Sequence, residues 1–240
     1  MPRHMRFLLI SLCLLAGFYP VGAQQAGLFG SREIRSTNMN SFDKWTELWR
    51  RHNLQRTQNE QARSPARMSA EENCRGRNRV ICNRDAWESF IAEQNTAISS
   101  EASAQQDYTP VTPELLSAVN VYMNRTTYVV DPVNWGIPDY WATPDEFFMK
   151  DGDCEDYAIS KYITLKRLGV DPSLMRVVVL QDENLRVAHA VLAVFYNGTF
   201  YILDNQVDGV LPHEKILHYR PVYSINESAW WLHQVRRFLR

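Results

Sequence analysis

The sequence predicts an α+β protein in which helices come first and an antiparallel sheet follows. Apolar residues recur at helical spacing up to about Gly169, and beyond it they alternate with period two or run continuously, as in strands. Asn197-Gly198 predicts a two-residue hairpin between two of these strands, because both central residues of such a turn need positive φ. We therefore expect helices packed on an antiparallel sheet.

The first 23 residues are expected to be a signal peptide. A basic start containing Arg3 and Arg6 precedes an apolar run from Phe7 to Phe18, and Ala23 ends a motif of small residues. The run is short of the ~20 residues that a membrane-spanning helix needs. An uncleaved N-terminal anchor is the alternative interpretation.

Cleavage after Ala23 would leave a mildly acidic protein. The chain has 26 basic and 27 acidic side chains, and loss of Arg3 and Arg6 leaves 24 against 27, a net charge of about −3. No segment gathers the Lys and Arg that phosphate binding requires. Nucleic acid is therefore not expected as a partner.

Three cysteines would remain after loss of Cys13, in what should be an oxidising compartment. Cys74 and Cys82 lie close together in an Arg-rich stretch and could close a small disulfide, which leaves Cys154 unpaired. Acidic residues at 151, 153, 155 and 156 surround Cys154. They argue against the alternative that Cys154 is merely a small residue of the core.

Three parts are expected after residue 23. Residues 24–107 form an N-terminal helical extension, residues 108–226 the main domain, and residues 227–240 a closing helix. The predicted elements are a flexible lead-in from Gln24 to about Asn40, a helix from Ser41 to His52, a loop or solvated helix from Asn53 to Glu72, helices opening at Asp85, Thr112 and Thr143, strands at Arg176–Gln181, Arg186–Tyr196, Thr199–Asp204 and Val222–Ile225, a connecting loop from Pro212 to Pro221, and a helix at Ser228–Phe238.

Cys154 stands at the start of an amphipathic helix that runs to Gly169. Ala158, Tyr162 and Leu165 form its apolar face. A cysteine at a helix N-terminus meets unpaired N–H groups and a partial positive charge, which favour the thiolate. This is a common way of preparing a nucleophile.

The predicted hairpin places a histidine beside a carboxylate. With a two-residue loop at 197–198, His189 lies opposite Gln206, and Val191 lies opposite Asp204. Asp204 is then the diagonal neighbour of His189 on the same face of the sheet, within reach of its side chain.

These residues predict nucleophilic catalysis. We assign Cys154 as the nucleophile, His189 as general base and then acid, and Asp204 as the residue that orients the imidazole. For the oxyanion hole the sequence offers the backbone N–H of Cys154 and the indole N–H of Trp135 or Trp141. His189 alone would more simply be a core histidine, and zinc fits poorly because no second Cys or His stands at ligand spacing.

Short motifs between Leu116 and Asn226 match a known family. They are Val119-Asn120, Asn124-Arg125, Trp135-Gly136, Asp139-Tyr140-Trp141-Ala142-Thr143-Pro144, the GDCEDYA string at 152–158 with Lys161-Tyr162, Ala188-His189 and Leu203-Asp204-Asn205. In these residues the chain resembles the bacterial transglutaminase-like cysteine peptidases, the family of the periplasmic LapG proteases.

The resemblance implies a papain-like, transglutaminase-like core, in which a helix carrying Cys packs on an antiparallel sheet carrying His and Asp. It also implies cleavage of a protein substrate in the periplasm. For LapG proteins this is the release of a surface adhesin, restrained by a cyclic-di-GMP-responsive inner-membrane receptor. The N-terminal extension and the C-terminal tail are not features of LapG itself and indicate a sister branch.

The resemblance further implies a calcium site. LapG proteins bind Ca²⁺ through acidic residues around the cysteine, and Asp153, Glu155 and Asp156 are the matching positions. Hard oxygen ligands packed this closely suit Ca²⁺. Alternatively, the same carboxylates only stabilise the N-terminus of the helix.

Two other functions would use the same residues. Acyl transfer to an amine, as in a transglutaminase, passes through the same thioester and differs only in the group that resolves it. A catalytically silent binding module would instead use the aromatic segment from Tyr128 to Pro144 to hold a partner. The intact Cys, His and Asp favour the peptidase.

Overall fold

The computed structural model describes residues 27–62, 79–101 and 108–235 and confirms the α+β class. Helices and strands follow one another in the expected order, with differences at the two ends of the chain. The elements are η1 Leu28–Gly30, β1 Arg32–Ser36, α1 Asp43–Ala62, α2 Arg79–Glu101, α3 Pro113–Asn124, α4 Asp131–Asn134, α5 Pro144–Lys150, α6 Cys154–Arg167, η4 Pro172–Leu174, β2 Met175–Asp182, β3 Val187–Tyr196, β4 Thr199–Leu203, β5 Leu211–Pro212, η5 His213–Lys215, β6 Tyr219–Ile225 and β7 Trp230–Gln234.

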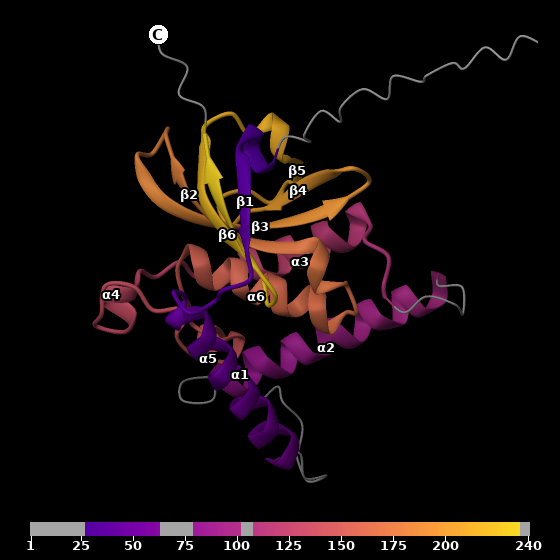
Figure 1. Ribbon diagram of the computed structural model, residues 1–240. Helices are drawn as coiled ribbons and strands as arrows, with labels where there is room; N and C mark the ends of the chain where they lie inside the picture. The colour runs from indigo at the N-terminus through magenta and orange to yellow at the C-terminus, as the bar shows by residue number, and fades with distance from the viewer. Residues whose placement is uncertain (1–26, 63–78, 102–107, 236–240) are drawn as a thin grey trace, which may run out of the picture.

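The strands of the described residues form one antiparallel sheet of seven strands. Their order is β1-β7-β6-β2-β3-β4-β5, so the first and last strands of the chain are neighbours at one edge. Figure 1 shows the larger helices gathered below the sheet, with α6 lying beneath its central strands. Within the described ranges, no helix is long and apolar enough to cross a membrane.

Each face of the sheet buries its own apolar cluster. Leu192 and Val194 of β3 join the large cluster that includes Tyr162 and Leu165 of α6. The alternate residues of the strand belong to the smaller cluster on the opposite face, which includes Leu28 of η1. Because successive side chains of a strand point to opposite faces, β3 is apolar on both sides, as expected for a strand covered on each face.

The predicted hairpin is confirmed residue by residue. Tyr196 pairs with Thr199, and Leu192 pairs with Leu203 at the last pair of the β3–β4 ladder. Asn197 has a φ of 50° and Gly198 a φ of 87°, the positive values that a two-residue turn of this kind needs.

Both ends of the described chain differ from the prediction. The helix expected at Ser228–Phe238 is wrong, because residues 230–234 form strand β7 between β1 and β6. The expected flexible lead-in is also wrong where it is described, since it holds η1 and β1. The two errors have one cause: β1 and β7 pair with each other, and partners far apart in the chain override local preference.

The remaining differences concern the extents of elements. Helix α1 runs on to Ala62 and α2 begins at Arg79, before the expected Asp85. The expected connecting loop from Pro212 to Pro221 contains η5 and the start of β6. The signal peptide, the side chains of the expected Cys74–Cys82 disulfide and the domain boundary near Asp107 lie outside the described residues.

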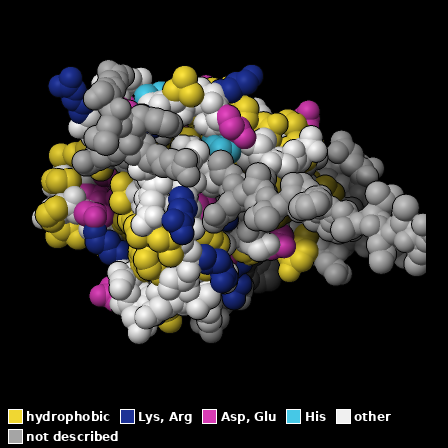
Figure 2. Space-filling model, turned by 45° about the horizontal axis from the view of Figure 1, so that its top comes forward, with side chains coloured by type: hydrophobic (Ala, Val, Ile, Leu, Met, Phe, Trp, Pro, Cys, Tyr) yellow, Lys and Arg dark blue, Asp and Glu magenta, His cyan; other side chains and the backbone are white. Residues whose placement is uncertain are grey.

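The surface carries both signs of charge. On the face drawn in Figure 2, Lys and Arg side chains lie at separate places among hydrophobic and other side chains. Several surface pairs of opposite charge are formed, such as Arg220 with Glu183 and Arg50 with Glu47. Exposed pairs of this kind contribute little to stability individually.

A buried histidine of β7 hydrogen-bonds side chains just before β1 and in β6, and it makes stability depend on pH. His233 Nδ1 lies 2.8 Å from Ser31 Oγ, and its Nε2 lies 2.9 Å from Ser224 Oγ. Burial lowers the pKa of His233 to about 4, against the opposing effect of Glu33. Between the ordinary histidine pKa and this value, the unfolded chain therefore binds more protons than the folded protein.

We expect the contribution of His233 to the free energy of unfolding to be complete above about pH 6.5 and to fall by up to ~3 kcal/mol as the pH approaches ~4. Urea unfolding at both pH values, in wild type and His233→Gln, measures the effect. The variant should lose less stability on acidification than the wild type. Equal losses in the two proteins would show that other groups are responsible.

Candidate active site

The turn before α6 is built to place Cys154 at the first position of the helix. The backbone N–H of Asp153, the N-cap residue, donates to Asp156 Oδ2 at 3.2 Å. A Cβ at Gly152 would overlap the side chains of Asp156 and Phe147, so this position needs glycine. The GDCED part of the motif therefore has a structural reason besides any chemical one.

The thiol of Cys154 meets β3 at the point where β4 leaves it. Tyr196 and Thr199 close the hairpin as a hydrogen-bonded pair, so every second residue of β3 back from Tyr196 directs its N–H toward β4. Ala190 is one of these residues, and it lies beyond the last pair of the ladder. Its backbone N–H instead faces the Cys154 side chain and acts to lower the pKa of the thiol. The thiol is thereby held beside the residue that follows His189.

His189 and Asp204 form a buried pair, as the register predicted. His189 Nε2 lies 3.0 Å from Asp204 Oδ1, and the two residues are 4% and 2% exposed. Asp204 also accepts hydrogen bonds from the Gln206 backbone N–H at 2.9 Å and from Tyr219 Oη at 2.6 Å. Burial acts to raise the pKa of Asp204, but these three partners, with His189 first, hold it below its usual value.

The pair also determines which ring nitrogen can accept the proton of the Cys154 thiol. Nε2 of His189 is engaged by Asp204, and the Gln206 side-chain amide nitrogen lies 3.4 Å from the same atom. Nδ1 is therefore the nitrogen left for Cys154. An Asp204 carboxylate on one nitrogen fixes the tautomer and stabilises the imidazolium once it forms.

The environment of the thiol differs from the sequence expectation. The helix N-terminus was expected to favour the thiolate, but burial raises the pKa of Cys154, and the nearby Glu155 and Asp153 raise it further. Cys154 Sγ lies 3.2 Å from Glu155 Oε2. The Ala190 N–H acts in the opposite direction and does not offset these effects. Ionisation of this thiol therefore requires positive charge nearby.

The acidic cluster beside Cys154 is larger than the sequence suggested. One carboxylate oxygen from each of Asp131, Asp153 and Asp156 lies within 4.8 Å of the other two, and the same holds for Asp131, Asp139 and Glu155. Burial, together with Asp153 and Asp139, raises the pKa of Asp131 to about 6. Burial and the neighbouring aspartates raise the pKa of Glu155 to about 9 and that of Asp156 well above its ordinary value.

Two features of this cluster fit a cation. Oδ1 of Asp131 and Oδ1 of Asp153 are buried and have no hydrogen-bond partner among the described residues. Buried carboxylates this close together repel one another unless they are protonated or share a positive ion. Asp156 has a structural role as well, because Oδ1 accepts the Ala142 N–H at 2.7 Å.

The two tryptophans named for the oxyanion hole lie in different surroundings. Trp141 is 7% exposed and packs in the large core cluster, with its ring 6.1 Å from that of Trp45. Trp135 packs on Tyr140, and its buried Nε1 has no partner among the described residues. Trp141 is therefore a core residue, whereas Trp135 keeps an unused donor.

Sequence reasoning missed Tyr219 and the two outer members of the acidic cluster. Tyr219 stands in the segment expected to be a connecting loop, and only its pairing in β6 brings its hydroxyl to Asp204. Asp131 and Asp139 flank the Trp135-Gly136 motif, but their distance from Asp153 depends on tertiary structure. Gln206 could have been identified from the sequence, because the hairpin register already placed it opposite His189.

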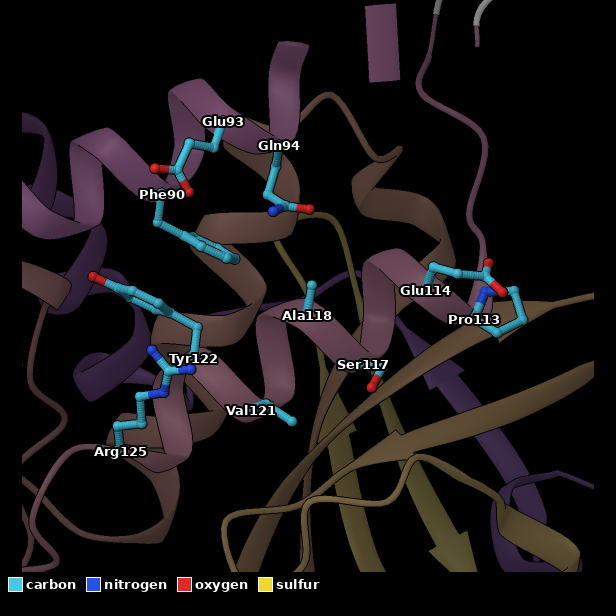
Figure 3. Close-up of a pocket in the computed structure, with 10 residues that line it drawn as sticks. All are labelled: Phe90, Glu93, Gln94, Pro113, Glu114, Ser117, Ala118, Val121, Tyr122 and Arg125. Atoms are coloured by element: carbon cyan, nitrogen blue, oxygen red, sulfur yellow. The ribbon is translucent and has the colours of Figure 1, made fainter. Parts of the chain in front are cut away.

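A separate hollow of about 740 Å³ lies between α2 and α3. Figure 3 shows the rings of Phe90 and Tyr122 facing each other there, and their centroids are 4.1 Å apart. It contains none of the predicted catalytic residues and none of the members of the acidic cluster beside Cys154. Its lining is Phe90, Glu93, Gln94, Pro113, Glu114, Ser117, Ala118, Val121, Tyr122 and Arg125.

Comparisons with known proteins identify the family and similar structures. The model of the bacterial transglutaminase-like cysteine proteinases matches residues 82–234. LapG of Legionella pneumophila is 31% identical in an alignment covering 64% of this chain and 77% of LapG, with a TM-score of 0.53. The EGTA-treated structure of LapG is 30% identical over 66% of this chain and 80% of LapG, with a TM-score of 0.55. The calcium-bound structure is 28% identical over 68% of this chain and 86% of LapG, also with a TM-score of 0.55. No curated protein matches the chain.

Proposed function

Because the chain belongs to the bacterial transglutaminase-like cysteine proteinases, and is thus a cysteine peptidase, we propose that Cys154, His189 and Asp204 are its catalytic triad. The observation that carries the proposal is the contact of the thiol with the Ala190 N–H, next to the His189–Asp204 pair. It joins the start of α6 to the hairpin that holds the base and the orienting acid.

The geometry supports hydrolysis through a thioester. His189 accepts the proton of Cys154 at Nδ1, and the thiolate attacks the scissile carbonyl carbon. The imidazolium then donates this proton to the leaving amine, and the acyl group remains on Sγ. His189 next takes a proton from water, which attacks the thioester and releases the acid product and the thiol. Asp204 keeps the imidazole in the required tautomer.

The oxyanion of each tetrahedral intermediate needs donors close to Cys154. The backbone N–H of Cys154 stands at the first position of α6, where no intrahelical acceptor is available to it. Trp135 Nε1 is the side-chain donor we propose beside it, because it is buried and unused. Trp141 has no such role in this proposal.

We also propose that the acidic cluster binds Ca²⁺. Asp131, Asp153, Glu155 and Asp156 would hold it, with Asp139 at the exposed side of the cluster. The proposal is supported by the orphaned oxygens of Asp131 and Asp153 and by the existence of a calcium-bound LapG structure. Bound Ca²⁺ would supply positive charge beside the thiol, where the carboxylates otherwise oppose its ionisation.

The substrate of a peptidase is a protein, and we propose that this one is a surface adhesin cleaved in the periplasm. The signal-peptide pattern of residues 1–23 and the similarity to LapG support this location and substrate. A cyclic-di-GMP-responsive receptor of the inner membrane is the proposed regulator. The substrate and the regulator follow from the similarity to LapG, whereas the triad also follows from the geometry.

The test is to compare proteins released from cells that express the wild type or Cys154→Ala. We expect the wild type alone to release a surface protein, and sequencing its new N-terminus gives the cleavage site. The variant must first be shown to be exported and folded, by fractionation and by a melting curve. Equal release from both strains would contradict the proposal, and attachment of an amine instead of cleavage would indicate acyl transfer.

A further inference from the structure

A fully buried lysine lies two turns along α6 from the proposed nucleophile. Lys161 is seven residues after Cys154, so the two residues lie on the same side of the helix. Its side chain is 0% exposed, and Nζ has no hydrogen-bond partner among the residues that the structure describes. A buried ammonium without a partner is costly, which calls for a reason.

Two carboxylates of the segment that follows β4 interact electrostatically with Lys161. Asp204 and Asp208 both act to keep Lys161 protonated, whereas burial lowers the pKa of Lys161 to about 7. The Lys161 Nζ also stands 5.7 Å from the centre of the Tyr157 ring. Lys161 therefore acts on the segment from Asp204 to Asp208 through its charge.

Two asparagines of α3 hold the same segment by its backbone. Asn124 Nδ2 donates to the Asp204 carbonyl at 2.9 Å, and Asn120 Nδ2 donates to the carbonyls of Val207 and Asp208 at 2.9 and 3.0 Å. Asn124 Nδ2 also lies 3.1 Å from Asp208 Oδ1. Residues 206–209 are exposed, so the hydrogen bonds from α3 help to hold them in place.

We propose that Lys161 is a positioning residue: its buried ammonium attracts the carboxylates of the Asp204–Asp208 segment, which Asn120 and Asn124 hold by its backbone, so that the Asp204 carboxylate faces His189. The inference rests on the proposed triad. Lys161 itself reaches no reacting atom and acts through Asp204. Its position on α6 also ties the helix that carries the nucleophile to the segment that carries the orienting acid.

A lysine that only fills space would behave differently from one that positions Asp204. Replacing a buried charge by an apolar side chain of similar volume is often neutral or stabilising. Lys161→Met should therefore fold and should melt at or above the temperature of the wild type. If Lys161→Met is as stable as the wild type but less active, the lysine positions Asp204; if it keeps full activity, the lysine only fills space.

The experiment measures kcat and KM of Lys161→Met on a peptide spanning the cleavage site found by N-terminal sequencing. We expect kcat to fall on the order of 10- to 100-fold, because a small misplacement of a catalytic group has effects of that size. KM should change little, since the lysine contacts no substrate. The rate of Cys154 alkylation by iodoacetamide should fall in the same direction and needs no substrate.

Three further variants make the result interpretable. Lys166→Met is the matched control, because Lys166 is on the same helix but is part-exposed and pairs with Glu227 at 2.6 Å. It should keep the wild-type kcat. Asn124→Ala removes hydrogen bonds from α3 to the same segment, so it should also lower kcat and leave KM nearly unchanged. If Lys161→Met does not fold, Asn124→Ala decides the question.

Asp204→Asn separates failure of this inference from failure of the proposed triad. A wild-type kcat in Asp204→Asn would overturn both. A damaged Asp204→Asn, together with wild-type kcat in folded Lys161→Met and Asn124→Ala, would overturn only the role of the lysine. A fall in kcat for Lys161→Met with KM and melting temperature retained would support it.

Discussion

Substitution of His189 by Gln is expected to lower kcat by about 10⁴- to 10⁶-fold, the range of losses seen when one member of a catalytic triad is removed. The physical reason is specific to this site. Burial and the carboxylates of Glu155 and Asp153 raise the pKa of Cys154, so the thiol ionises only if a base accepts its proton within the site. Peptide hydrolysis and the alkylation rate of Cys154 by iodoacetamide should fall together, because both require the thiolate.

A second histidine gives the control for this prediction. His52 lies on α1, and burial lowers its pKa to about 4, so it is neutral near pH 7. His52→Gln should keep the wild-type kcat and alkylation rate. If His189→Gln kept a normal alkylation rate, the thiol would be activated by another group, and the assignment of His189 as the base would be wrong.

Chelation of Ca²⁺ is expected to lower the melting temperature by roughly 5–10 °C, relative to protein saturated at about 100 times Kd. Four carboxylates crowd the space beside Cys154, and two of their oxygens are buried without a partner among the described residues. Without a cation, part of the cluster must take up protons or remain in repulsion, and either costs stability. Differential scanning fluorimetry with EGTA and then with added Ca²⁺ measures the shift.

The variant Asp131→Asn tests whether the shift comes from this cluster. It keeps an acceptor for the Tyr140 N–H, which bonds Asp131 Oδ2, but removes one negative charge. In EGTA it should melt at or above the temperature of the wild type, and added Ca²⁺ should raise its melting temperature less. Mg²⁺ is the ion control, because it prefers a smaller octahedral site and keeps its water. An equal Ca²⁺ response in both proteins would place the ion elsewhere.

The parts of the site that could be predicted depend on short-range geometry. A two-residue turn fixes the register of its hairpin, so the sequence alone placed Asp204 beside His189. The cysteine helix was likewise visible in the helical spacing of Ala158, Tyr162 and Leu165, and α6 begins at Cys154. In both places, neighbouring residues in the chain determine the outcome.

The parts that could not be predicted depend on contacts between distant segments. Tyr219 reaches Asp204 only because β6 pairs with β2, and Asp131 reaches Asp153 only because α4 lies against the turn before α6. The ionisation of Cys154 depends on the balance between a favourable helix end, burial and nearby negative charge. A sequence motif shows the favourable helix end, but it does not give the size of the effects of burial and of nearby negative charge.

The pairing of β1 with β7 has a consequence for the order in which the molecule can be completed. Ser31 and His233, which meet across this edge, are 202 positions apart in the chain. A chain made or exported from its N-terminus therefore holds β1 without its partner until β7 has emerged. Such a contact closes one of the longest loops the chain allows and is expected to form late. This side of the sheet is thus completed only when both β1 and β7 are present, so a chain that stops before β7 leaves β1 unpaired.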